Sequence, residues 1–355
     1  MYKDFYASLK PLEGEIPYAE EERLAASGAP LLSWYRKNRR LLPWRENPEP
    51  YSVWISEIML QQTRVEAVKP YFARFMEALP DITSLAQVDE ERLLKLWEGL
   101  GYYNRVRNMQ IAAQTVVEEY DGVLPASYEK LLSLKGIGSY TAGAIASIAY
   151  DIPVPAVDGK VLRVITRIIE DDGDIMKQSV KKRIENKLQE IMPGEYPGDF
   201  NQALMELGAV VCVPNGEPKC DVCPVAFCCG ARAHGTIDRF PVKAQKKDRK
   251  LEDRTVLVIQ DGEKTAIRRR PSRGLLAGLY ELPNLKGHLS EEEVLESVKA
   301  MDLEPLRIEA LPEAKHIFSH IEWRMTAYRV RVSSLEEIRQ NDLLFVGKRQ
   351  SDDQY

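Results

Sequence analysis

All five cysteines of the chain fall within eighteen consecutive positions, as Cys212, Cys220, Cys223, Cys228 and Cys229. Their spacing is Cys-x7-Cys-x2-Cys-x5-Cys if Cys229 is the fourth member, and it ends in x4 if Cys228 is. Four thiolates from one short loop can bind an iron–sulfur cubane, whereas the paired Cys-x2-Cys knuckles of a structural zinc site are not formed. A disulfide framework is typical of small secreted domains and fits this long chain poorly. We therefore favour one four-iron four-sulfur cluster over zinc or a chance grouping, with the fourth ligand open between Cys228 and Cys229.

Glu57 lies in a predicted helix and is flanked by Ile55, Ile58 and Met59. Apolar surroundings raise the pKa of a carboxyl group, so that it can stay protonated at neutral pH and serve as a general acid. An exposed helical glutamate is the alternative. The Gln-Gln-Thr sequence at 61–63 follows on the same helix and suits a contact with stacked bases better than a solvated end.

A second carboxylate, Asp158, follows a proline-rich loop and precedes an amphipathic helix. In that position it either caps the helix or projects into a cleft, and the two roles are compatible. Twenty residues earlier, the segment Leu134–Gly143 ends one helix, turns at Gly136 and Gly138, and opens another. The glycines permit a tight turn with positive φ whose backbone N–H groups can hold a phosphate, which predicts a helix-hairpin-helix at about residues 131–145. Taken alone, the same pattern also fits a plain helix cap.

The elements that carry these residues are predicted as two domains joined by a linker. Residues 1–230 are expected to be all-α, because apolar residues recur at helical spacing, as in Val53–Thr63, Glu90–Glu98, Val106–Glu118 and Val161–Glu170. Residues 231–250 are expected to be a basic linker, since its part from Arg239 has six cations and one anion. Residues 251–355 are expected to be α+β. They carry predicted strands at Thr255–Gln260, Thr265–Arg270, His316–Phe318 and Trp323–Val332 and a helix at Ser290–Ala300.

The composition is that of an ordinary globular protein, with 44% hydrophobic and 8% aromatic residues. No stretch approaches the eighteen or so apolar residues of a membrane span, so we expect no membrane partner and a cytoplasmic location. The net charge of −5 argues against a protein that coats nucleic acid without specificity, but it leaves room for a local basic face.

With these motifs in view, the chain resembles the adenine DNA glycosylases of the MutY family, within the endonuclease III superfamily, over nearly its whole length. The resemblance rests on Leu42–Arg64, Trp97–Asn108, the hairpin, the Asp158 segment, Phe200–Ala209, the cysteine loop at 212–229, and His316–Trp323. It implies two helical lobes with a DNA cleft between them, an iron–sulfur loop, and a Nudix-like C-terminal domain that inspects 8-oxoguanine opposite the adenine. It also implies a monomer that acts on double-stranded DNA with A:8-oxoguanine or A:G mispairs, in a bacterial-type nucleoid.

The resemblance also assigns roles to single residues. Glu57 matches the acid that protonates adenine N7, Asp158 the carboxylate that stabilises or transiently bonds the oxocarbenium-like sugar, and Tyr140 a catalytic neighbour of that aspartate. The residues implied to contact substrate or DNA are Gln62, Thr63 and Tyr102 beside 8-oxoguanine, Trp44, Arg45, Leu60 and Gln202 in the adenine pocket, Phe318, Ser319 and His320 in the lesion-reading loop, and Arg105, Gly136, Gly138 and Lys160.

Tyr140 argues for base removal without strand cleavage, because bifunctional lyases of the superfamily carry a lysine there and a phenol cannot form a Schiff base. Two features depart from the family pattern. The first cysteine interval is x7 where x6 is more common, and Lys160 replaces the usual asparagine. At the other end of the cysteine loop, the x5 interval favours Cys229 as the last ligand. The ammonium of Lys160 could pair with Asp158, place an amine near the sugar, or simply face solvent.

Three rival functions remain. A thymine-glycol-type glycosylase/lyase of the same superfamily lacks the residues that follow the linker. A Nudix hydrolase needs an arginine and paired glutamates on one helix to hold magnesium, and the acidic run after Ser290 has no such arginine. A damage-binding protein without enzyme activity is the third, and measured adenine release would exclude it.

Overall fold

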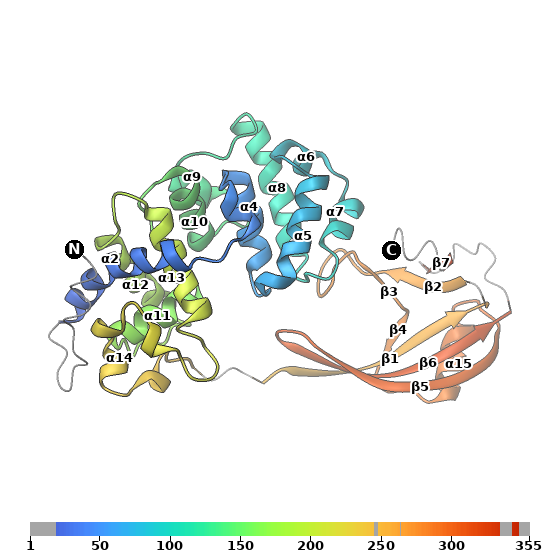
Figure 1. Cartoon of the computed structure of the whole chain (residues 1–355). Helices are drawn as coiled ribbons and strands as arrows, with labels where there is room; N and C mark the ends of the chain where they lie inside the picture. Colours follow the sequence, from blue (N-terminus) through green and yellow to red (C-terminus); the bar gives the residue numbers. More distant parts are fainter. Residues whose placement is uncertain (1–18, 245–247, 263, 334–342, 348–355) are drawn as a thin grey trace. The chain divides into compact units, whose positions relative to one another are not determined.

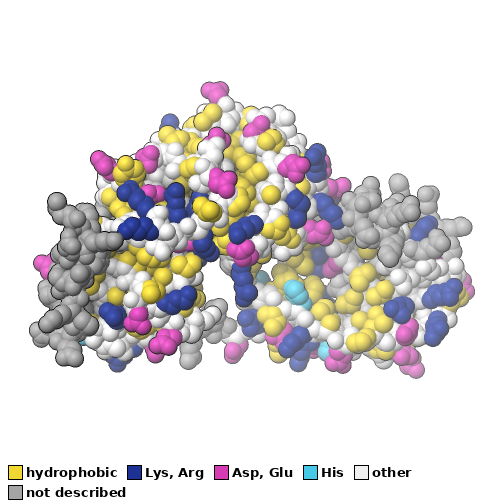
Figure 2. All heavy atoms as spheres, in the orientation of Figure 1, with side chains coloured by type: hydrophobic (Ala, Val, Ile, Leu, Met, Phe, Trp, Pro, Cys, Tyr) yellow, Lys and Arg dark blue, Asp and Glu magenta, His cyan; other side chains and the backbone are white. Residues whose placement is uncertain are grey.

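The computed structural model describes residues 19–244, 248–262, 264–333 and 343–347, which divide between two compact units. The first unit extends to Ala244 and is a set of packed helices, and the second contains a twisted sheet (Figure 1). On the side seen in Figure 2, basic side chains are scattered among acidic and apolar ones on each unit. Among the described residues, no helix is both long and apolar enough to cross a bilayer.

The first unit is helical, as expected, and its described part contains no strand. Its elements are α2 (Glu20–Asn38), α3 (Pro43–Glu46), α4 (Pro50–Leu60), α5 (Val65–Ala78), α6 (Ile82–Gln87), α7 (Glu90–Trp97), α8 (Asn104–Glu119), α9 (Tyr128–Ser133), α10 (Ser139–Tyr150), α11 (Gly159–Ile169), α12 (Gln178–Glu190), α13 (Pro197–Val210), η1 (Cys220–Val222), η2 (Ala226–Cys228), α14 (Gly230–Ala233) and η3 (Ile237–Arg239). The four helices predicted from apolar spacing occur as α4, α7, α8 and α11. Helix α7 starts at Glu90 as predicted, whereas the other three start earlier than predicted. Local features mark two of these starts, since Pro50 occupies the first turn of α4 and Asp158 caps α11.

Two groups of helices form the unit, and α10 packs against both. One group consists of α2, α11, α12 and α13, which share an apolar core with the cysteine loop. The other group contains α4, α5, α7 and α8, and within it the rings of Phe75 and Trp97 meet edge to face at 6.0 Å. Because α10 contacts α4 on one side and α13 on the other, residues in its first turn lie where the two groups meet.

The linker predicted at residues 231–250 is wrong in its first half. Helix α14 and the turn η3 continue the helical unit, and Phe240 is only 9% exposed. The carbonyl of Phe240 accepts a hydrogen bond from Arg167 at 3.1 Å, and that of Val242 accepts one from Ile175 at 3.1 Å. These contacts are made by backbone carbonyls and one apolar ring. The prediction of a linker used only the charged residues, so it could not detect them. The boundary between the units lies after Ala244.

The second unit is α+β, as predicted. Its described residues form a seven-stranded mixed sheet of order β3-β2-β1-β6-β5, with β4 paired to β1 and β7 paired to β2. Its elements are β1 (Lys250–Gln260), β2 (Lys264–Arg269), β3 (Tyr280–Glu281), β4 (Asn284–Lys286), α15 (Glu291–Lys299), β5 (Pro305–Ile317), β6 (Ile321–Val332) and β7 (Leu343–Gly347). Strands β1 and β6 run parallel, and the other pairs are antiparallel. Only the end of β5 was predicted, because this strand is exposed along most of its length and has no alternating pattern.

Candidate active site and cysteine pocket

Glu57 lies on α4 with only 6% of its surface exposed, which excludes the exposed alternative. The phenol of Tyr140, in the first turn of α10, donates a hydrogen bond to Oε2 of Glu57 and lies 3.7 Å from the sulfur of Met205. Burial raises the pKa of Glu57, while the Tyr140 hydrogen bond and the cations Lys160 and Arg45 oppose part of the rise. Burial also raises the pKa of Tyr140 well above its usual value, so the phenol keeps its proton at neutral pH.

Asp158 is the N-cap of α11, and each of its carboxylate oxygens has a partner. Oδ1 accepts hydrogen bonds from the backbone N–H groups of Lys160 at 2.8 Å and Val161 at 2.9 Å. Oδ2 is 2.8 Å from the ammonium of Lys160. Of the three sequence alternatives for Lys160, the structure therefore contains the ion pair with Asp158. The charges of both residues influence the pKa of Glu57, so the pair and the buried acid belong to one electrostatic site.

An ion-pair network connects the short helix α3 to α13. Glu206 on α13 is 1% exposed and accepts hydrogen bonds from Arg40 at 2.6 Å and from Arg45 at 2.9 Å. Although burial opposes it, these hydrogen bonds keep the pKa of Glu206 below its ordinary value. Trp44 is buried on α3 and Leu60 is half-buried at the end of α4. Sequence reasoning missed Glu206, although an acid inside an apolar helical run could have pointed to it.

Asn201 fixes the proline-rich loop that precedes Asp158. It is fully buried on α13, its amide oxygen accepts from the N–H of Ala156 at 3.0 Å, and its amide nitrogen donates to the carbonyl of Val154 at 2.9 Å. Gln202, predicted to line the base pocket, is the next residue and is half-buried. Asn201 is thus a second residue that sequence reasoning missed, and its polar side chain among apolar neighbours was the only signal.

The hairpin predicted at residues 131–145 is present between α9 and α10. Gly136 has φ of +80°, and a Cβ there would lie 2.7 Å from the Cβ of Asn108, so both conformation and space select glycine. Gly138 is the N-cap of α10 with φ of −93°, so the positive φ expected of it is wrong. Apart from its chain neighbours and the backbone of its own helix, no atom of the described residues lies within 4 Å of where its Cβ would be. The first N–H groups of α10 have no partner within the helix, which makes this end suited to an anion.

Two exposed turn tips carry residues predicted to lie beside the lesion. Gln62 follows α4 and Tyr102 precedes α8, and both have left-handed backbone, with φ of +61° and +48°. Thr63 is half-buried beside the first tip. Arg105, predicted to contact DNA, donates hydrogen bonds to four backbone carbonyls in these two turns. The structure therefore brings all four residues together and gives Arg105 a role inside the protein.

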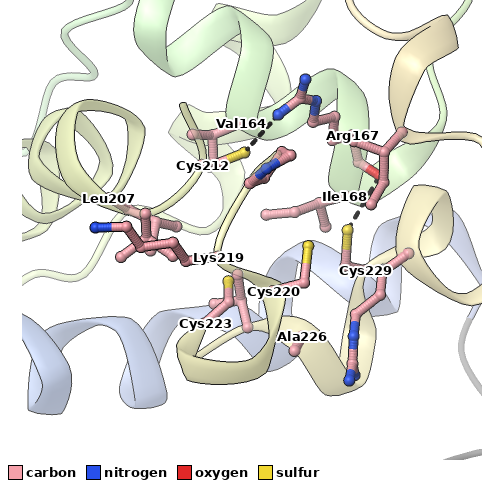
Figure 3. A pocket seen from close by; sticks show the side chains of 15 residues that line it. Val164, Arg167, Ile168, Leu207, Cys212, Lys219, Cys220, Cys223, Ala226 and Cys229 are labelled. Atoms are coloured by element: carbon pink, nitrogen blue, oxygen red, sulfur yellow. Dashed lines mark hydrogen bonds between the residues drawn. The ribbon is translucent and has the colours of Figure 1, made fainter. Parts of the chain in front are cut away.

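Four of the five cysteines line one pocket. In Figure 3, the sulfur of Cys212 faces those of Cys220, Cys223 and Cys229 across it. Cys228 is buried outside this lining, and its thiol donates to a backbone carbonyl of its own turn at 3.4 Å. The geometry thus selects Cys229 over Cys228. Burial raises the pKa of Cys223 to about 12 and that of Cys229 to about 11, so a cation is needed to hold them as thiolates at neutral pH.

Helix α11 connects the carboxylate site to the cysteine pocket. Asp158 caps its N-terminus, and further along the helix Arg163 donates to the carbonyls of Gly208 at 2.7 Å and Cys212 at 2.9 Å. Arg167, on the same helix, has a guanidinium nitrogen 3.3 Å from the sulfur of Cys212 (Figure 3). Both arginines therefore anchor the start of the cysteine loop to α11.

The predicted lesion-reading residues form the turn between β5 and β6. The N–H of Phe318 donates to the carbonyl of Ile321 at 2.8 Å, which leaves Ser319 and His320 exposed at the tip. The ring of Phe318 meets that of Trp323 edge to face at 5.1 Å, and two arginine side chains lie over the Trp323 ring. The base of the turn is therefore packed while its tip is open.

Comparison with known proteins agrees with this architecture. Residues 55–193 match the model of the HhH-GPD superfamily base excision DNA repair proteins, and residues 255–354 match the Nudix domain. A solved thermostable thymine-DNA glycosylase shares 25% identity at a TM-score of 0.54, over 61% of this chain and 100% of its own. A trapped endonuclease III–DNA covalent intermediate gives a TM-score of 0.52 at 23% identity, over 61% of this chain and 97% of its own. The fold and the site thus define a base excision repair glycosylase of the helix-hairpin-helix class with an added Nudix-like domain.

Two curated relatives narrow the class. The adenine DNA glycosylase of Mus musculus is 35% identical over 89% of this chain and 76% of its own length. That of Buchnera aphidicola subsp. Acyrthosiphon pisum (strain APS) is 33% identical over 86% of this chain and 87% of its own. The chain belongs to the adenine DNA glycosylase (MutY) family.

Proposed function

We propose that the protein hydrolyses the N-glycosidic bond of adenine paired with 8-oxoguanine or guanine in double-stranded DNA. The observation that carries this proposal is the buried Glu57, whose pKa is raised, beside the Asp158–Lys160 pair in a member of this family. A buried acid next to a fixed carboxylate is the arrangement needed to break a glycosidic bond by protonating the leaving base and stabilising a cationic sugar.

The proposed reaction begins when adenine is flipped out of the duplex. Glu57 donates its proton to N7 of adenine, and the electron pair of the C1′–N9 bond leaves with the base. The phenol of Tyr140 then donates its hydrogen bond to the Glu57 carboxylate that remains. Asp158, held by two backbone N–H groups of α11, stabilises the positive charge on the sugar until water adds at C1′ and loses a proton to solvent. Trp44, Arg45, Leu60 and Gln202 are proposed to line the base pocket.

Binding of DNA is proposed to use the hairpin and the two turn tips. The N-terminal end of α10, with open space at Gly138, suits a backbone phosphate. Gln62, Thr63 and Tyr102 would occupy the space beside the lesion. Solved structures of similar fold include a non-covalent endonuclease III–DNA complex. Ser319 and His320, exposed after the packed Phe318, are proposed to recognise 8-oxoguanine, and the protein is proposed to act as a monomer.

The cysteine pocket is proposed to hold one four-iron four-sulfur cluster through Cys212, Cys220, Cys223 and Cys229. Four sulfurs around one cavity fit a cluster, which is larger than a single ion. Such a cluster would cross-link the loop through its bonds to the four cysteine thiolates, and it could exchange an electron. The residues around it hold α11, and hence Asp158, in place.

The experiment that tests the function compares three duplexes, with adenine opposite 8-oxoguanine, guanine or thymine, each with and without alkali. We expect free adenine from the first two and strand breaks only after alkali. Strand cleavage without alkali would show a lyase and contradict the assignment based on Tyr140. Absence of adenine release opposite both 8-oxoguanine and guanine would refute the proposed reaction.

A further inference from the structure

Arg105, at the start of α8, joins two turns that are separate in the sequence. One guanidinium nitrogen donates to the carbonyls of Ile58 at 2.6 Å and Gln61 at 2.8 Å. Another donates to the carbonyls of Leu100 at 3.0 Å and Gly101 at 3.1 Å. The first pair closes the end of α4, and the second pair closes the turn between α7 and α8. A single planar group therefore fixes the backbone of both turns.

In each of the two turns, the residue that follows the last clamped carbonyl has a strained backbone. Gln62 follows Gln61 with φ of +61°, and Tyr102 follows Gly101 with φ of +48°. Left-handed backbone is unfavourable for side chains other than glycine, and it persists only where the surrounding structure imposes it. Both side chains are exposed. The clamp by Arg105 is the feature that the two tips share.

The surroundings of Arg105 hold it in this position as a cation. Its guanidinium lies 5.3 Å from the centre of the Trp97 ring and 5.6 Å from that of Tyr102. Burial lowers the pKa of Arg105 to about 10, so it stays charged at neutral pH. Trp97 reinforces the second turn by donating from its indole nitrogen to Gly101 at 3.1 Å. A lysine could not replace it, because an ammonium lacks the fork that reaches two acceptors on each side.

We propose that Arg105 is a positioning residue: it holds the side chains of Gln62 and Tyr102 at a fixed separation, so that both enter the duplex together when adenine is flipped out. It does so without contacting DNA, since the hydrogen bonds from its two terminal nitrogens are made to the protein backbone. This inference rests on the proposed function and replaces the sequence-based expectation that Arg105 itself binds DNA.

The test measures single-turnover adenine release at saturating enzyme from two duplexes. In one, adenine is paired opposite 8-oxoguanine; in the other, it faces a tetrahydrofuran abasic analogue and needs no displacement. Arg105→Met should slow release from the paired duplex on the order of 10²-fold, as misplaced reacting groups do, and should change release from the abasic duplex little. Arg107→Met is the matched control on the same helix, because it removes an arginine paired with Glu90 at 2.7 Å, and both rates should stay near wild type.

A double-mutant cycle tests whether Arg105 acts through the tips. In a Gln62→Ala/Tyr102→Ala background, adding Arg105→Met should slow release no further, because the side chains that it positions are absent. Arg105→Lys provides the same comparison if the methionine variant does not fold, and it should lose rate on the paired duplex only. Equal losses on both duplexes, or additive losses in the cycle, in variants that melt like wild type would overturn the proposal. Failure of the wild-type protein on both duplexes would instead overturn the proposed function.

Discussion

The phenol of Tyr140 donates a hydrogen bond to the carboxyl group of Glu57, which lies 83 residues earlier in the chain. This contact joins the first turn of the hairpin helix α10 to the buried face of α4. Tyr140 is a phenol, which cannot form a Schiff base with the sugar, and its hydrogen bond stabilises the carboxylate of the proposed acid. The same residue therefore bears on both the proposed acid catalysis and the proposed absence of strand cleavage.

Replacing Glu57 with glutamine should abolish most base excision. The amide keeps the shape and the hydrogen bond from Tyr140 but cannot give a proton to N7, so single-turnover excision should fall on the order of 10²–10⁴-fold. Affinity for the A:8-oxoguanine duplex, measured by fluorescence anisotropy, should stay the same. Glu66→Gln, which changes an exposed glutamate paired with Lys69, is the control and should excise normally. Near-native excision by the Glu57 variant would exclude its role as the acid.

The pH profile of excision should shift when Lys160 is changed to asparagine. Glu57 must be protonated, so activity is present below its pKa and lost as pH rises through it. Burial raises this pKa and the cation Lys160 lowers it. Removal of the cation should therefore raise the pKa further and move the alkaline limb of kcat/KM to higher pH.

The control for this shift is Lys95→Asn, which removes one positive charge from an exposed pair with Glu98 and should leave the alkaline limb in place. Addition of borohydride during the reaction should trap no covalent protein–DNA adduct with the wild-type protein or with the Lys160→Asn variant. The reason is that the Lys160 ammonium of the wild type is paired with Asp158 at 2.8 Å. An adduct that depends on Lys160 would show that its amine reaches the sugar. An alkaline limb that moves to lower pH, or not at all, would contradict the electrostatic argument.

The two adjacent cysteines should differ in their effect on iron content. Purified protein should contain about four irons per chain. Cys229→Ser should lose iron because this sulfur lines the pocket, whereas Cys228→Ser should retain it because its thiol is buried outside. Elemental analysis of anaerobically prepared protein measures both. Removal of iron by a chelator should lower the melting temperature, since the loop then loses its cross-links. Zinc in place of iron would contradict the cluster.

Truncation after Ala244 should give a folded protein that still removes adenine. This fragment should have lost most of its preference for 8-oxoguanine over guanine. All residues proposed for excision precede this point, and Phe318–His320 follow it. Truncation after residue 230 should instead destabilise the helical unit, because it removes the buried Phe240 and the carbonyl of Val242. Melting curves and excision rates on the two lesion pairs measure the outcomes. Undiminished discrimination in the longer fragment would move lesion recognition to Gln62, Thr63 and Tyr102.

The linker and the strand β5 show where the sequence pattern was insufficient. The charges at residues 239–250 predicted a solvated linker, but Phe240 is buried against the helical unit. The contacts that bury it cannot be inferred from the composition of the segment. Strand β5 is hydrogen-bonded to β6 but mostly exposed. Its sequence therefore lacks the alternation of apolar and polar residues on which strand prediction depends. Both are cases in which backbone hydrogen bonding between distant segments decided the structure.

The sequence by itself determined the helical and α+β units, the cysteine set, and the candidate acid, because apolar spacing, caps and ligand intervals are local properties of the chain. Only the tertiary structure decided what each group contacts. It paired Lys160 with Asp158, hydrogen-bonded Glu57 to Tyr140, separated Cys228 from Cys229, and turned Arg105 toward the backbone. It also revealed Glu206 and Asn201, whose roles come from partners far away in the sequence. The physical reason is that burial, charge pairing and pKa depend on side-chain positions in three dimensions, which helix packing sets and residue spacing does not encode.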